Sequence, residues 1–165
     1  MQLIPIFLKE LQQESKITRK MLERIPDDKY DWKPHPKSMT IKQLSTHIAE
    51  LPGWIAMALT TNGLDFAASP YKPTEINNTK DLLNLFYQSL EIGESHLIPE
   101  NESKLSDSWI LKNGDQVLSN TTKAEVIRMA LNQVTHHRAQ LGVYLRLLDI
   151  PIPGSYGPSA DDPGF

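Results

Sequence analysis

Apolar residues recur at helical spacing in four stretches of this chain, and proline, glycine and asparagine gather between them. The stretches cover about residues 3–25, 40–62, 79–97 and 122–149. Within each, the apolar side chains fall on one face of an α-helix, so the pattern predicts four amphipathic helices. One carboxylate interrupts the first stripe, which consists of Leu3, Phe7, Leu11, Glu14, Thr18, Met21, Leu22 and Ile25.

Local signals mark where these helices bend or end. Pro52-Gly53 falls inside the second stretch and predicts a kink, or a carbonyl freed from the helical hydrogen-bond pattern. Thr122-Lys-Ala-Glu125 is a capping box, in which both side chains bond backbone N–H groups at the start of a helix. Pro151 stops the same helix. The fourth helix is therefore defined at both ends.

The connections between the helices are long. Residues 63–78 are predicted to be a loop, whereas residues 98–121 contain Asn113-Gly114 between apolar residues, which predicts a short β-hairpin. A length of 165 residues suits one hydrophobic core. We therefore expect residues 1–165 to form a single all-α domain, a four-helix bundle with long crossover connections.

Composition narrows the classes of function. The net charge is -3 and there is no stripe of lysine and arginine, which argues against a nucleic-acid partner. The chain has no cysteine, so any metal must use histidine, carboxylate, amide or water. No apolar run reaches about 18 residues, so we expect no membrane span. The N-terminus lacks a basic region followed by a cleavage site, so a cytoplasmic location is expected.

Two histidines lie on the apolar faces of different predicted helices. His47 is about 60° from Leu44 and about 40° from Leu51 around its helix. His137 is central on the face of the last helix, and Gln133 lies about 40° to one side, one turn away. Side chains at this spacing can reach one ion, and a ligand from a facing helix would leave one position open for water. We expect His47, His137 and Gln133 to hold a divalent metal; the ordinary alternative is two hydrogen-bonded core histidines.

Other polar residues near these positions have two readings each. His136 lies about 100° from His137, at the flank, where a neighbouring helix, a partner subunit or water would meet it. Glu50 is nearly one turn beyond His47 and could orient an imidazole or act as a base. The alternative for Glu50 is a carboxylate in solvent at the rim of the bundle.

Two aromatic residues and one arginine are candidates for a pocket. Trp54 and Tyr144 each lie two turns beyond one of the two histidines, although aromatics at this spacing are more often part of the core. Arg138 could pair with Asp161 or Asp162 and so fold the C-terminal tail over the bundle. Its alternative is an ordinary surface arginine.

Short motifs are spread over nearly the whole chain: Trp32-Lys-Pro-His35 with Ser38-Met-Thr40, Leu44-Ser-Thr-His47-Ile, His136-His137-Arg138-Ala-Gln140-Leu141, and Tyr156-Gly-Pro-Ser-Ala-Asp161. With these motifs the chain resembles the DinB/YfiT-like family, whose members are described as metalloenzymes. The resemblance implies a four-helix bundle, frequently dimeric, that holds nickel or zinc. It also implies a ligand set of one histidine on the second helix, matched by His47, and a His-x-x-x-His pair on the fourth, whose last member is matched by His137.

The resemblance further implies a reaction class. Characterised members include transferases and isomerases that bring a low-molecular-weight thiol, such as bacillithiol or mycothiol, to the metal, and others are described as metal-dependent hydrolases. A bound metal lowers the pKa of a thiol or water and makes it a nucleophile near neutral pH. We therefore expect a thiol-dependent transferase or a hydrolase that acts on a small-molecule substrate.

The chain departs from the family pattern at Gln133, where the first histidine of the pair is expected. An amide oxygen is a weaker, neutral ligand for zinc or nickel than an imidazole. Three outcomes are open: a weaker site that uses Gln133 directly or through water, rescue by another side chain, or loss of the metal. The second hypothesis is accordingly a non-enzymatic dimeric helical-bundle protein with a degenerate metal site.

Overall fold

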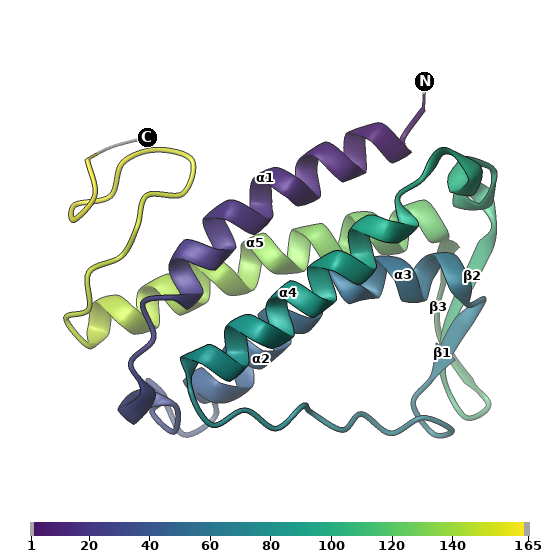
Figure 1. The fold of residues 1–165 in the computed structure, drawn as a ribbon. Helices are drawn as coiled ribbons and strands as arrows, with labels where there is room; N and C mark the ends of the chain where they lie inside the picture. Colours follow the sequence, from purple (N-terminus) through teal and green to yellow (C-terminus); the bar gives the residue numbers. More distant parts are fainter. Residues whose placement is uncertain (1, 164–165) are drawn as a thin grey trace.

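The computed structural model describes residues 2–163, in which helices precede and follow a small sheet (Figure 1). The α-helices are α1 (Ile4–Leu22), α2 (Ile41–Glu50), α3 (Gly53–Thr60), α4 (Thr79–His96) and α5 (Lys123–Leu147). Two 3-10 helices lie in the connections, η1 (Asp27–Lys29) and η2 (Pro99–Ser106). The strands are β1 (Gly63–Asp65), β2 (Ser108–Asn113) and β3 (Gln116–Thr122). The single domain expected for residues 1–165 includes residues 1, 164 and 165, which lie outside the described part.

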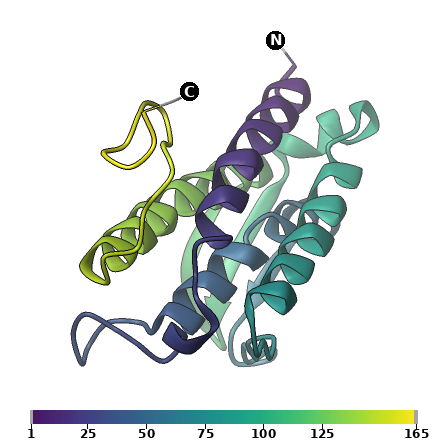
Figure 2. The same ribbon diagram turned by 60° about the vertical axis from the view of Figure 1, so that its left-hand side comes forward.

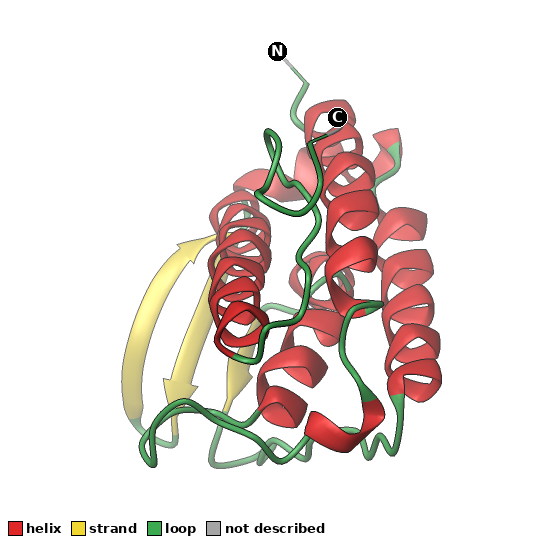
Figure 3. Cartoon of the chain, turned by 90° about the vertical axis from the view of Figure 1, so that its left-hand side faces the viewer, coloured by secondary structure: helices red, strands yellow, loops and turns green. Residues whose placement is uncertain are grey.

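The expected all-α class is wrong, because the three strands form a mixed sheet at one end of the helices (Figures 1 and 3). The sheet order is β1-β2-β3. β2 and β3 are antiparallel and form the hairpin predicted around Asn113-Gly114, where Gly114 has the positive φ of 59° that favours glycine. β1 lies in the segment expected to be a loop, and it pairs with β2 in parallel.

The sequence pattern missed β1 because a strand of three residues has no periodicity to detect. Its pairing depends on close backbone approach: a Cβ added to Gly63 would lie 2.2 Å from the carbonyl oxygen of Ile110. The Asp65 carboxylate then accepts a hydrogen bond from the backbone N–H of Gly114 at 2.9 Å. A non-local contact, and not a local propensity, therefore makes this segment a strand.

The four predicted helical segments pack as a bundle (Figure 2). α1 packs against both α4 and α5, and so does the α2–α3 pair. The bundle is therefore a ring in which α4 and α5 are each flanked by α1 and by the α2–α3 pair. Phe86 of α4 and Leu141 of α5 are buried in one apolar cluster, and Trp109 of β2 and Ile127 of α5 in a second. Among residues 2–163, no helix has both the length and the apolar character needed to cross a bilayer.

The second predicted helix breaks at Pro52-Gly53, as the sequence indicated, and becomes α2 and α3. Ser89 of α4 joins the two pieces, because its hydroxyl accepts from the Gly53 N–H at 2.8 Å and donates to the Glu50 carbonyl at 3.0 Å. Gly93, one turn further along α4, lets the two backbones meet. The break is therefore stabilised by tertiary contacts as well as caused by proline.

Replacing Gly93 by alanine is expected to destabilise the fold by about 1–3 kcal/mol, the usual cost of overpacking. An added Cβ would lie 2.4 Å from the Pro52 carbonyl oxygen, which is backbone and cannot turn away. Gly142→Ala in α5 is the matched control, since its Cβ would meet only the end of the flexible Met21 side chain, with Cε at 3.5 Å and Sδ at 3.9 Å. Alanine favours a helix over glycine by up to about 1 kcal/mol, so the control should be neutral or stabilising. Equal denaturant midpoints for the two variants would contradict this account of the break.

Candidate functional site

α2 and α5 bring the three predicted ligands to one point. The Gln133 amide oxygen, Oε1, lies 3.1 Å from His47 Nε2 and 3.0 Å from His137 Nε2. The ring centroids of His47 and His137 are 4.8 Å apart, with the planes at 75°. His47 and Gln133, 86 positions apart in the chain, therefore converge, because α2 and α5 pack against each other with these faces turned inward.

A neutral imidazole carries one proton, and Gln140 influences which nitrogen of His137 holds it. Gln140 Oε1 lies 2.9 Å from His137 Nδ1, so a proton on Nδ1 is donated to Gln140. Nε2 then presents its lone pair towards Gln133 and His47. Histidines that bind metals commonly donate their other N–H in this way, which fixes the tautomer and ring orientation. The Gln133 oxygen lies as close to Nε2, so the two amides compete for the one proton, and His137 can act as a ligand through Nε2 in the form that Gln140 favours.

The surroundings also keep His137 neutral. Burial lowers the pKa of His137 below its ordinary value, and the hydrogen bond with Gln140 opposes this by raising it. The neighbouring imidazoles of His47 and His136 lower the pKa of His137 further. Because only a neutral imidazole can donate its lone pair to a cation, these contributions favour metal binding on balance.

The donor set can be tested against the needs of a metal ion. Donor atoms bound at about 2.1 Å to one ion are about 3.0 Å apart at a right angle and about 3.4 Å apart in a tetrahedron. The two contacts of Gln133 Oε1 fall at the lower end of this range. Within residues 2–163, no group of three histidine, cysteine, aspartate or glutamate side chains is placed to hold a metal ion, so a metal bound here would need the Gln133 amide as its third protein donor. Two imidazoles and one amide are ligand types that suit a divalent ion, and the distance from the amide oxygen to each imidazole nitrogen fits one.

A cleft of about 610 Å³ opens beside His47, a size typical of small-molecule sites. His47 and Gln43 of α2 line one side, and Lys33 and Lys37 of the preceding loop line another. Tyr71, from the connection between β1 and α4, also lines the cleft. The edge of the Trp54 ring packs on His47 with centroids 5.4 Å apart, so Trp54 holds the imidazole in place from α3.

Glu50 holds the connection before α4 against α2. Its carboxylate accepts hydrogen bonds from the Tyr71 hydroxyl at 2.7 Å, from the Thr74 backbone N–H at 3.3 Å and from the Thr74 hydroxyl at 3.1 Å. Burial and the Glu50 carboxylate raise the pKa of Tyr71 well above its ordinary value. Both Glu50 oxygens are engaged here, so the structure gives Glu50 the role of anchoring one wall of the cleft.

A model of the DinB family matches residues 2–163. The chain belongs to the DinB family. Its fold is similar to that of the DinB-like protein YjoA of Bacillus subtilis, with 19% identity, a TM-score of 0.68, and coverage of 90% of this chain and 96% of the other. A DinB-like protein of Bacillus cereus is 17% identical with a TM-score of 0.67, and the match covers 91% and 95% of the two chains. No curated protein matches the chain.

The other candidate residues of this DinB-family chain lie apart from the convergence point or at its edge. The exposed His136 packs against His137 with ring centroids 4.9 Å apart, on the α5 face next to a second, shallower cleft. Tyr144 packs edge-on against Trp32, with centroids 5.7 Å apart, and so fixes the loop before α2. Tyr144 is therefore a partly buried residue at the edge of the hydrophobic core.

Arg138 is buried and points to α1. It pairs with Glu14 at 2.6 Å and bonds the Thr18 hydroxyl at 3.0 Å. Arg138 also donates to the Tyr156 hydroxyl of the tail at 2.9 Å. The expected pairing of Arg138 with Asp161 or Asp162 is replaced by this pairing with Glu14. Glu14, the carboxylate within the apolar stripe of the first helix, was the signal that an internal partner was needed.

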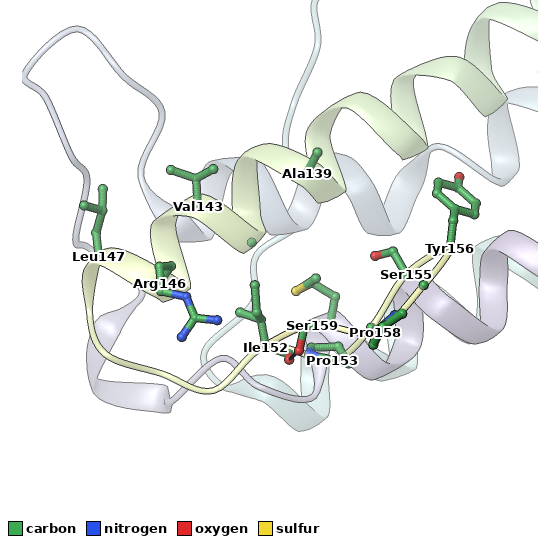
Figure 4. A pocket seen from close by; sticks show the side chains of 14 residues that line it. Ala139, Val143, Arg146, Leu147, Ile152, Pro153, Ser155, Tyr156, Pro158 and Ser159 are labelled. Atoms are coloured by element: carbon green, nitrogen blue, oxygen red, sulfur yellow. Dashed lines mark hydrogen bonds between the residues drawn. The ribbon is translucent and has the colours of Figure 1, made fainter. Parts of the chain in front are cut away.

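The tail does fold over the bundle, through Arg146 instead. Arg146 pairs with the Asp161 carboxylate, which also accepts from the Ile152 N–H. Between the tail and α5 lies a groove of about 500 Å³, lined from α5 by Ala139 and Val143 among others and from the tail by Ile152 and Pro153 (Figure 4). The histidines do not line this groove, so it is separate from the DinB candidate site.

Gln140 and Tyr71 are among the residues of the site that the sequence analysis missed. Gln140 appeared only as part of a family motif, although its position three residues after His137 placed it on the same helical face. Tyr71 lies in a segment without periodicity, and only its hydrogen bond to Glu50 brings it to the cleft. The first could have been found from helical spacing; the second could not.

Proposed function

We propose that this DinB-family protein is a metal-dependent enzyme that acts on a small molecule, with a divalent nickel or zinc ion held by His47, His137 and Gln133. The observation that carries the proposal is the convergence of two imidazole nitrogens on one amide oxygen within 3.1 Å. When bound, the ion would make a thiol or a water molecule nucleophilic near neutral pH. The reaction is then transfer of a low-molecular-weight thiol to an electrophile, or hydrolysis.

The chain's own residues prepare the site for this chemistry. With the His137 proton on Nδ1, Gln140 accepts a hydrogen bond from it, and the Trp54 ring packs against the His47 ring, so both Nε2 atoms keep their direction before any ligand arrives. Three protein donors leave further coordination positions for the nucleophile. The cleft beside His47 admits a small substrate to that point. The chain has no cysteine, so a thiol nucleophile has to be supplied from outside.

Metal analysis tests the proposal directly. The protein, stripped with a chelator and then dialysed against nickel or zinc, is expected to retain stoichiometric metal. His47→Ala and His137→Ala should each weaken binding by at least about tenfold, since even residues that only orient a ligand contribute about 10- to 100-fold. His96→Ala is the matched control, because the His96 ring bonds the Ile92 carbonyl of its own helix. Metal retention that is equal in all four proteins, or absent from the wild type, would overturn the proposal.

A second function is favoured by one specific observation. If Nε2 carries the proton in both rings, Gln133 Oε1 accepts two hydrogen bonds, and the triad is satisfied without any ion. In that case the protein is a non-enzymatic helical-bundle protein, expected from the family resemblance to be dimeric, whose site has lost its metal. Wild-type protein free of metal after loading would support this function over the enzyme.

A further inference from the structure

The charged residues that line the cleft beside His47 are all positive. Its lining includes the two ammonium groups of Lys33 and Lys37, and among the described residues that line it there is no carboxylate. The carboxylate bonded to Tyr71 of the cleft lining, that of Glu50, has both oxygens engaged by Tyr71 and Thr74. The mouth of the cleft is therefore electropositive, although the whole chain has a net charge of -3.

The loop that carries the lysines is fixed by its own hydrogen bonds. Lys33 Nζ donates to the Pro36 carbonyl at 3.1 Å, which draws this side chain back across the loop. The His35 ring accepts from the Lys37 N–H at 3.1 Å, and the His35 carbonyl accepts from the Ser38 N–H at 2.9 Å. These bonds fix the backbone of the loop and the Lys33 side chain, so less conformational entropy is lost when a ligand binds.

The backbone N–H groups at the start of α2 are not free to bind a negative group, because they already have partners. The Ile41 N–H donates to the Trp32 carbonyl at 2.9 Å, and the Lys42 N–H donates to the Tyr30 carbonyl at 2.8 Å. The Gln43 N–H is bonded by the capping threonine. Recognition of a negative group in this cleft therefore depends on side chains. Besides the lysines, the Gln43 amide offers its NH₂ group, since its oxygen already accepts from that threonine's backbone N–H.

We propose that this cleft binds an oxyanion group of the substrate, a carboxylate or a phosphate, and that Lys33 and Lys37 determine this specificity. The reacting part of the same molecule then lies towards His47, which also lines the cleft. The placement of the reaction rests on the proposed function, but the binding of the anion does not. The substrate class of the enzyme is thus a small organic anion.

Titration with simple anions tests the inference without knowledge of the substrate. Inorganic phosphate and acetate are titrated separately into isotope-labelled protein at low ionic strength, in the metal-free and the metal-loaded forms, and amide shifts are followed by NMR. Phosphate is expected to shift the amide signals of Lys37 and Gln43 in both forms. The double substitution Lys33→Gln with Lys37→Gln should raise the Kd for phosphate roughly tenfold, and added salt should do the same to the wild type.

The control removes the same charge elsewhere: Lys9→Gln with Lys104→Gln changes two exposed lysines outside this cleft and should leave the Kd unchanged. Equal weakening in both double variants would overturn the inference, because the effect would be one of net charge. So would shifts confined to other regions. Lysine-dependent binding of phosphate but not acetate would assign a phosphorylated substrate, and binding of both would assign either anion. If lysine-dependent binding occurs in a protein that holds no metal, only the proposed function fails; if metal binds and the lysines are irrelevant, only this inference fails.

Discussion

Replacing Glu14 by glutamine is expected to lower the free energy of unfolding by about 3 kcal/mol, because it leaves the guanidinium of Arg138 buried without a counter-charge. Arg138 is 2% exposed and Glu14 8%. The carboxylate accepts from Arg138 at 2.6 Å and from the Tyr156 hydroxyl at 2.8 Å. The substitution keeps the shape of the side chain, so the loss reports the charge and not a cavity.

Glu10→Gln is the matched control for this measurement. Glu10 lies one turn earlier on the same helix and pairs with Arg128, but both side chains are partly exposed, at 31% and 42%. Exposed pairs contribute about 0–1 kcal/mol, so this variant should unfold close to the wild type. Both free energies come from denaturant titration at one pH. A difference between the two variants of less than about 1 kcal/mol would contradict the assignment of a buried, essential counter-charge.

Gln133→His is expected to tighten nickel or zinc binding by at least about tenfold, because an imidazole is a better ligand for these ions than a neutral amide. The Gln133 amide oxygen already lies 3.0 and 3.1 Å from the two histidine Nε2 atoms. A histidine at this position adds a third nitrogen at the same point. The measurement is a competition titration against a chelator of known affinity.

Val143→His separates this effect from that of any extra histidine. Val143 is exposed on α5, lines the groove under the tail, and has no histidine three or four residues away on the helix. The control variant should bind metal like the wild type. Tight binding in Gln133→His together with none in the wild type would favour the degenerate, non-enzymatic protein. Unchanged affinity in both variants would mean that position 133 is not a ligand position.

The candidate site was predictable to the extent that helical geometry is local. Spacing alone placed His47, Gln133 and His137 on inward faces, and each face follows from residues within one or two turns. The role of Gln140 follows the same rule. Lys33, Lys37 and Tyr71 were outside its reach, because loop residues have no period. The two lysines are placed by the local hydrogen bonds of their loop, and Tyr71 by its bond to Glu50, 21 positions away.

The sequence by itself determined the helices, the break at Pro52-Gly53, the hairpin turn and the faces that carry the histidines, because these depend on short-range sterics and hydrogen bonds between near neighbours. The tertiary structure decided the rest. It made β1 a strand by parallel pairing with β2, gave Arg138 its partner Glu14, and set Gln133 between two imidazoles. Those outcomes depend on which surfaces meet in the folded chain. The local sequence pattern allows several partners for each of these residues, and long-range packing selects one of them.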